Sequence, residues 1–202
     1  MLVAHRKYPG LGLPYTLGGI VKLHAELVIR DVLGERWGAF VVTIEFPLAY
    51  PQIPPRLYED QGRIKRTPDW HVNGDDSLCI GPEVSELEKY DGAAHLQDWL
   101  DRSAIPFLAN HLHKERTAEY KNGEFQHYTE GIWEYYAGEW NCSRAEVLRR
   151  LSLITGEVTV PRNELCYCGS DLPWAKCHGP RILKSTVLRR AYAADLNRLR
   201  KS

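Results

Sequence analysis

The sequence predicts an α+β fold, in which an antiparallel sheet comes first and several helices follow. Apolar and polar residues alternate from Val21 to Arg30 and again from Phe40 to Phe46, which is the period-two pattern of strands with one buried face. Apolar residues at helical spacing then run from Leu96 to Leu112. A run of strands followed by a run of helices is typical of this fold class.

The strands can be placed in order along the chain. Residues 1–19 are rich in glycine and proline and show no helical period, so we expect an irregular lead-in. The two alternating segments flank a turn at 31–36 and form an antiparallel hairpin. A proline-rich segment, 46–58, is expected to turn and enter a short third strand. Residues 60–92 have no regular period and predict a long loop-rich region.

Two signals define the helices that follow. Pro106 lies inside the helical pattern over 96–112, where it must kink the helix or begin a new one. Ser143 and Glu146 form a capping box, which predicts a helix over 144–154.

Charge is balanced over the chain but not along it. Lys and Arg total 26, and Asp and Glu also total 26, which excludes a chain-wide basic surface for nucleic acid. Residues 181–202 hold seven basic residues and one acidic residue, a net charge of +6, so residues 1–180 carry −6. Residues 182–200 are predicted to form a basic amphipathic helix. It either binds an acidic protein, RNA or lipid headgroups, or packs on the main domain as a solvated helix.

The location predicted from the sequence is cytoplasmic. No run of about 18 apolar residues exists, and the first ten residues lack the apolar core of a signal peptide, so no membrane span is expected. The five cysteines are an odd number, and three of them lie within 166–177. This pattern favours metal binding and free thiols over a disulfide framework.

Four residues near the C-terminus have the spacing of a zinc site. They are Cys166, Cys168, Cys177 and His178. Structural zinc is held by four tetrahedral sulfur or nitrogen ligands, and Gly169 and Gly179 are expected to permit the tight turns of a small knuckle. The pattern resembles the C-terminal zinc motif of the protein-export motor SecA, which implies one structural Zn²⁺ per chain and a role in partner docking. The alternative is three free thiols and an unrelated histidine.

Cys79 is the candidate nucleophile. It lies in a polar, glycine-containing loop, 71–82, that can present a side chain to solvent. Asn73 stands six residues earlier and carries an amide donor. A thiolate and an amide that donates to a developing oxyanion can together support acyl transfer. The alternative is an inert, buried cysteine.

The order of these elements resembles the ubiquitin-conjugating enzyme family. A hairpin, a Phe-Pro-x-x-Tyr-Pro-x-x-Pro-Pro segment, a His-x-Asn tripeptide, a cysteine and a long helix follow one another over residues 20–135. The family implies a four-stranded antiparallel meander with helices packed on one side. It also implies that Cys79 accepts a ubiquitin-like modifier, or another protein's C-terminus, as a thioester and passes it to an amine. Asn73 would stabilise the oxyanion, and His71 would shape the loop.

The resemblance is strongest to divergent bacterial members, which act in antiphage defence. It implies an activating enzyme, a modifier and a target protein, such as a defence nucleotide cyclase, as partners. Nucleic acid is not an expected partner. We therefore predict three parts: a ubiquitin-conjugating-like domain at 1–155, a linker with the zinc knuckle at 156–180, and a basic amphipathic helix at 181–202.

The chain also departs from the family pattern. Val72 replaces the proline of the tripeptide, and residues 1–19 lack the N-terminal helix that docks the activating enzyme. Asp75, Asp76 and Asp91 are alternative bases for the attacking amine. Two other functions stay open, namely a catalytically inactive scaffold that docks partners and a nucleic-acid-binding protein that uses the zinc knuckle and the basic tail.

Overall fold

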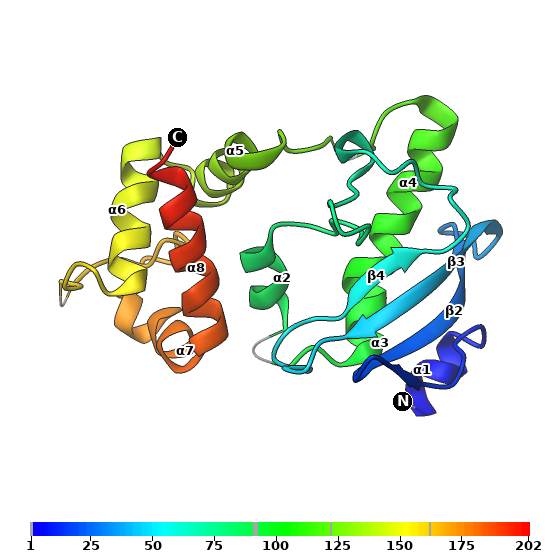
Figure 1. Ribbon diagram of the computed structural model, residues 1–202. Coiled ribbons are helices and arrows are strands. Elements are labelled where there is room, and N and C mark those ends of the chain that lie inside the picture. Colours follow the sequence, from blue (N-terminus) through cyan, green and yellow to red (C-terminus); the bar gives the residue numbers. More distant parts are fainter. Residues whose placement is uncertain (1, 91–92, 122, 162) are drawn as a thin grey trace. The chain divides into compact units, whose positions relative to one another are not determined.

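The computed structural model describes residues 2–90, 93–121, 123–161 and 163–202 (Figure 1). The chain divides into two compact units. The sheet unit consists of Met1–Gly81 and Gly92–Glu124, and the helical unit consists of Pro82–Asp91 and Phe125–Ser202. The predicted boundaries after residues 155 and 180 both lie inside the helical unit, because the helices on either side of each boundary share one apolar core.

The described residues contain a four-stranded antiparallel meander in the order β1-β2-β3-β4. Its strands are β1 (Tyr15–Leu17), β2 (Ile20–Arg30), β3 (Arg36–Phe46) and β4 (Arg56–Glu59). The predicted hairpin of β2 and β3 is confirmed, and its facing pairs Leu23–Ile44 and Leu27–Phe40 are buried. The prediction missed β1, because three residues are too few to show a period. The signal was the pair Gly18–Gly19, whose positive φ angles suit the two-residue turn between β1 and β2.

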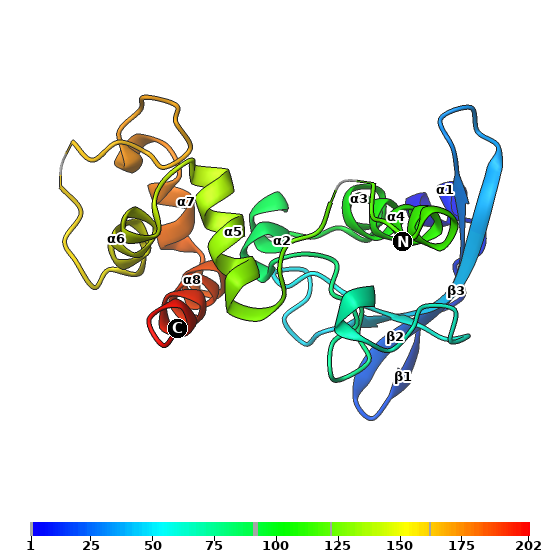
Figure 2. The ribbon, with the colours of Figure 1, turned by 90° about the horizontal axis from the view of Figure 1, so that it is seen from above.

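One long helical segment covers a face of this sheet (Figure 2). It consists of α3 (Leu96–Trp99), a π-helical turn η2 (Leu100–Ala104) and α4 (Ile105–Thr117). Pro106 has no N–H to donate to the preceding turn. The π-helical turn, in which the Ile105 N–H bonds the Leu100 carbonyl, lies directly before it, so the helix continues past the proline. Close packing is possible at Gly38 of β3, where a Cβ would come within 2.8 Å of the Leu112 side chain.

The N-terminal segment is partly helical, which corrects the expected irregular lead-in. α1 (Leu2–Lys7) ends before Pro9, the first of the glycine and proline residues, so helix-compatible residues precede the helix breakers. Lys7 donates to the Asp101 carboxylate in η2 at 2.7 Å, and the Tyr8 hydroxyl donates to the same carboxylate. These contacts join α1 to the long helical segment.

The helical unit is built from short helices around one core. They are α2 (Glu83–Lys89), α5 (Tyr128–Trp140), α6 (Arg144–Thr155), η3 (Trp174–Lys176), α7 (Gly179–Lys184) and α8 (Thr186–Leu199). The predicted cap by Ser143 is confirmed, since the Glu146 N–H bonds Ser143 Oγ at 3.3 Å at the start of α6, whereas the Glu146 carboxylate accepts from Arg149 and Arg150. The buried core also contains Cys166 and Trp174, so the knuckle is part of this unit rather than an appendage.

The predicted basic helix over 182–200 is two helices, because Ser185 interrupts it. Ser185 Oγ accepts the Leu188 N–H at 3.1 Å and caps the start of α8. α8 buries Leu188 and Tyr192 in the core of the unit, whereas Arg189 and Arg190 are exposed. The amphipathic pattern therefore reflects packing within the helical unit.

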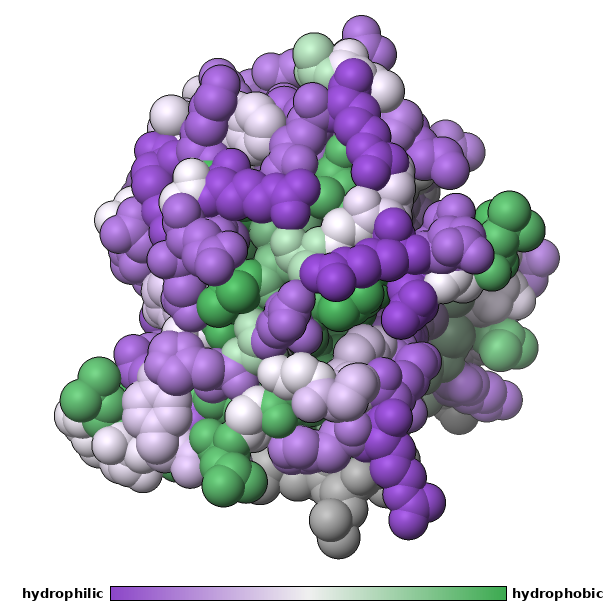
Figure 3. Space-filling view, turned by 90° about the vertical axis from the view of Figure 1, so that its right-hand side faces the viewer, coloured by the Kyte–Doolittle hydropathy of each residue, from purple (hydrophilic) through white to green (hydrophobic). Residues whose placement is uncertain are grey.

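One face of the molecule is mostly hydrophilic (Figure 3). Figure 3 shows this face, on which hydrophobic side chains appear as separate patches. Val32 and Leu33, at the turn between β2 and β3, and Leu48, after β3, are exposed. No helix within the described residues is long and apolar enough to cross a membrane.

Candidate metal centre and thiol site

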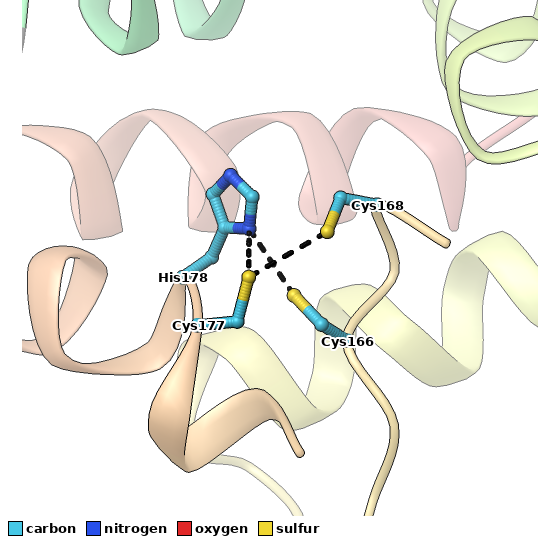
Figure 4. A group of neighbouring side chains, drawn as sticks. All are labelled: Cys166, Cys168, Cys177 and His178. Carbon is cyan, nitrogen blue, oxygen red and sulfur yellow. Dashed lines mark hydrogen bonds between the residues drawn. The ribbon is translucent and has the colours of Figure 1, made fainter. Parts of the chain in front are cut away.

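The metal-centre residues come from two turns of the helical unit (Figure 4). Cys166 and Cys168 lie on a turn that the Gly169 N–H closes on the Cys166 carbonyl at 3.3 Å. Gly169 has a φ of 71°, which favours glycine, so its predicted turn role is confirmed. Cys177 ends η3, and His178 is the residue before α7. Two hydrogen bonds join the base of this loop: Cys166 N–H to the Leu172 carbonyl at 2.9 Å, and Trp174 N–H to the Glu164 carbonyl at 2.7 Å.

The four donor atoms have the spacing of a tetrahedral site. All of them lie within 4.8 Å of one another. His178 Nδ1 is 3.2 Å from both Cys166 Sγ and Cys177 Sγ, and the Sγ atoms of Cys168 and Cys177 are 3.6 Å apart. Zinc–sulfur bonds of about 2.3 Å and zinc–nitrogen bonds of about 2.0 Å place tetrahedral ligands roughly 3.5–3.8 Å apart. The three individual distances lie within a few tenths of an ångström of these values, so the residues present fit a zinc-sized ion.

The environment of Cys166 determines how its thiol loses a proton. Burial raises the pKa of the Cys166 thiol to about 11, because a thiolate is poorly solvated there. A divalent cation reverses this preference by binding the thiolate directly.

Gly179 has a different role from the one predicted. It lies in α7 and does not supply a positive φ angle. A Cβ at this position would lie 2.7 Å from the Trp174 carbonyl oxygen and 2.7 Å from the indole ring. Gly179 therefore permits close packing of α7 on η3, directly after His178.

The candidate thiol site is a small hairpin in the sheet unit. It follows η1 (Pro68–Trp70), and the Cys79 N–H donates to the His71 carbonyl at 2.7 Å. The Val72–Leu78 pair forms a β-bridge and is buried. Because side chains alternate along a strand, Asn73 and Cys79 lie on the opposite side from this pair. Cys79 is half-buried and Asn73 is exposed.

The tip of the hairpin is fixed by hydrogen bonds. The Asp76 N–H bonds the Asn73 carbonyl at 3.0 Å, and the Asn73 side-chain amide donates to Ser77 Oγ at 3.0 Å. Ser77 in turn donates its hydroxyl to Asp75 Oδ1 at 2.6 Å, which lowers the pKa of Asp75 below its ordinary value. An acid with a lowered pKa is a weak base, so Asp75 is poorly suited to accept a proton. The third predicted base, Asp91, lies outside the described residues.

His71 connects the hairpin to the end of α4. Its φ of 50° is left-handed, and its ring centroid lies 4.9 Å from that of Tyr120. His71 Nε2 is 3.9 Å from a carboxylate oxygen of Glu124, and the same oxygen is 3.6 Å from the Lys114 ammonium. The prediction missed Tyr120, Glu124 and Lys114, because only the folded chain brings 114–124 beside 70–71.

His111 lies at the centre of the same cluster. It is fully buried, and neither ring nitrogen has a hydrogen-bond partner among the described residues. Its ring packs on Phe107 at 4.5 Å and on Tyr120 at 5.4 Å between centroids. Burial, followed by the positive charge of His71 and Lys114, lowers the pKa of His111 to about 3. His111 is therefore neutral at neutral pH and acts as packing behind the hairpin.

The comparison with known families agrees with the metal centre. No curated protein and no solved structure matches the chain. Residues 162–180 match the family model described as the SEC-C motif. The matched segment contains all four residues of the cluster in Figure 4. The helical unit therefore carries a SEC-C motif, and Cys166, Cys168, Cys177 and His178 are the residues in it that could hold a metal ion.

Proposed function

We propose that the chain is an acyl carrier and transferase of the ubiquitin-conjugating type, with Cys79 as the nucleophile and one structural zinc ion in the SEC-C motif. The observation that carries this proposal is the hairpin that follows the four-stranded meander. It supports Cys79 by a backbone hydrogen bond to His71, leaves Cys79 half-buried, and places it on the same side of the hairpin as the exposed Asn73.

In the loading step, the Cys79 thiolate attacks the carbonyl carbon of an incoming thioester. A new carbon–sulfur bond forms, the donor's carbon–sulfur bond breaks, and the donor leaves as a thiol after taking up a proton. The bound acyl group is a thioester on Cys79. This exchange is close to isoenergetic, so the protein needs to supply chiefly position and thiolate character.

In the transfer step, an amine attacks the Cys79 thioester and negative charge develops on the carbonyl oxygen. An Asn side chain has two N–H donors, and that of Asn73 uses one on Ser77 Oγ. The second is available to an oxyanion. The amine loses a proton as the amide bond forms, and Cys79 leaves as a thiolate.

We propose that the carboxylate of Glu124 interacts with the attacking amine. It lies beside His71, which faces Cys79 across the hairpin. A carboxylate there favours the approach of a positively charged target lysine. The partners that follow from this chemistry are a thioester-bearing activating enzyme, a modifier and an amine-bearing target, and we place the system in bacterial antiphage defence by its resemblance alone.

The zinc ion has a structural part in this proposal. The four ligands complete a tetrahedral set, and a full set leaves no coordination position for substrate. Zinc supplies folding free energy to a knuckle and fixes the turns that carry its ligands.

The loading step can be tested with a glycine-ended peptide thioester as the donor. We expect a mass increase equal to the acyl group, which Cys79→Ala abolishes and a thiol reductant reverses. Cys142→Ala is the matched control, because Cys142 is also half-buried but burial raises its pKa. An adduct that forms equally on Cys79→Ala would refute the assignment of the nucleophile.

A further inference from the structure

Glu88 of α2 is bound by residues from both turns that carry the metal ligands. The Tyr167 hydroxyl donates to Glu88 Oε1 at 2.8 Å. The Arg181 guanidinium donates to the backbone carbonyl of the same residue. Tyr167 lies between Cys166 and Cys168, and Arg181 follows His178 by three residues. Two contacts therefore run from the metal centre to one residue of α2.

The Tyr167 side chain is packed on both sides. Its ring is buried, with centroids 5.0 Å from the His178 ring and 4.9 Å from the Trp140 ring. Since both sequence neighbours of Tyr167 are metal-binding cysteines, a bound ion fixes the backbone on either side of it. The position of its hydroxyl thus depends on the metal centre.

The carboxylate of Glu88 is enclosed by a second hydroxyl. Tyr192 of α8 also donates to Glu88 Oε1, and the two tyrosine oxygens are 3.2 Å apart. Both hydroxyls thus point at one carboxylate oxygen of Glu88. Both phenols act as donors to this carboxylate. Hydrogen bonds to a charged acceptor are stronger than those between neutral groups.

The helix α2 depends on such contacts. It has seven residues, and its N-cap residue, Pro82, has no side-chain acceptor for the first N–H groups. Helices this short are unstable in water without tertiary packing. Val84 and Leu87 pack into the core of the helical unit, and Glu88 supplies the polar contacts.

We infer that Glu88 is a positioning residue that couples α2 to the metal centre, so that metal binding orders α2. This coupling does not depend on the acyl-transfer proposal. The helix α2 begins at Glu83, four residues after Cys79, so the coupling acts on the chain next to the candidate nucleophile. Metal binding thereby orders the chain segment that follows Cys79.

Amide hydrogen exchange of the full chain, with and without Zn²⁺, tests this coupling. In the native chain, zinc is expected to slow exchange in the peptide spanning 83–90 by about tenfold, the size of a lost hydrogen bond to a charged group. Glu88→Ala should bind zinc with unchanged stoichiometry, yet exchange in α2 should be as fast as in the zinc-free chain. Glu88→Gln keeps an acceptor for the tyrosines and should restore part of the slowing.

Variants in the zinc-loaded chain separate coupling from general unfolding. Tyr167→Phe keeps the ring packing and removes the donor, so it should speed exchange in α2 but not in α6. Glu139→Ala and Tyr128→Phe, which change an exposed carboxylate and an exposed phenol of α5, should leave exchange in α2 unchanged. The inference is overturned if zinc-loaded Glu88→Ala and Tyr167→Phe both show native exchange in α2.

Discussion

The backbone N–H of Cys79 donates to the carbonyl oxygen of His71 at 2.7 Å, so the candidate nucleophile is fixed to the residue that opens its hairpin. His71 has a left-handed backbone, and its ring packs on Tyr120 after α4. A left-handed conformation costs a residue other than glycine about 1 kcal/mol, which the surrounding packing must offset. A substitution of Tyr120 is therefore expected to move the backbone of His71 and, through its hydrogen bond, the backbone of Cys79.

Asn73→Ala is predicted to separate the two chemical steps. Loading begins with the thiolate and should survive the change. Transfer to an amine should slow by about 10²–10³-fold, the effect of removing one donor to an oxyanion. Single-turnover decay of the preloaded chain measures this, with Ser77→Ala as the control for the hydrogen bond that Asn73 makes within the hairpin. Equal losses of both steps in the two variants would show that Asn73 only supports the loop.

His111→Leu is predicted to reduce the sensitivity of the fold to acid. The folded-state pKa of His111 is about 3, below its ordinary value of 6.5. As the pH falls below 6.5, the unfolded chain binds a proton that the folded chain does not, so the free energy of unfolding decreases until about pH 3. Between pH 7 and pH 5 this amounts to at most about 2 kcal/mol. Urea unfolding at both pH values should show a smaller decrease in His111→Leu.

His113→Leu on the same helix is the control for that experiment, because His113 is only half-buried. It should keep the native loss of stability between pH 7 and pH 5. At pH 7 the His111→Leu chain should be no less stable than the native chain, since the change removes two buried ring nitrogens without partners. A native acid response in His111→Leu would rule out His111 as its source.

The double change Cys166→Ser and Cys177→Ser is predicted to remove the metal and to destabilise the helical unit. Elemental analysis of the native chain should give about one zinc per chain, and the double variant should give none. The helices α5, α6 and α8 share the core that contains Cys166, so their exchange protection should fall, whereas β2 and β3 should keep theirs. Full zinc content in the double variant would contradict the assigned ligands.

Gly179→Ala is predicted to weaken metal binding through packing alone. The added Cβ would collide with Trp174, and relief of that contact must move α7 and with it His178. Overpacking of this kind costs about 1–3 kcal/mol. Gly138→Ala in α5 is the matched control, because a Cβ there has no heavy atom within 4 Å among the described residues. Chelator competition should show lower zinc affinity only for Gly179→Ala.

The parts of the fold that could be predicted are those with local signals. Alternation identified β2 and β3, the Ser143–Glu146 pair identified α6, and ligand spacing identified the metal cluster. The membership of α2 in the helical unit could not be predicted, because it rests on contacts of Glu88 with Tyr167 and Tyr192, about 80 and 100 residues away. The grouping of His71, His111 and Glu124 was missed for the same reason.

The most direct test of the central claim is a pulse–chase measurement on the loaded chain. Cys79 is first loaded from the glycine-ended peptide thioester, and the donor is then removed. Free lysine is added as the chase, and the acyl group is followed by mass. We predict that the Cys79 adduct decays faster as lysine increases and that acyl-lysine appears in equal amount. Decay only to the free acid, at a rate that lysine does not change, would contradict the proposed transferase.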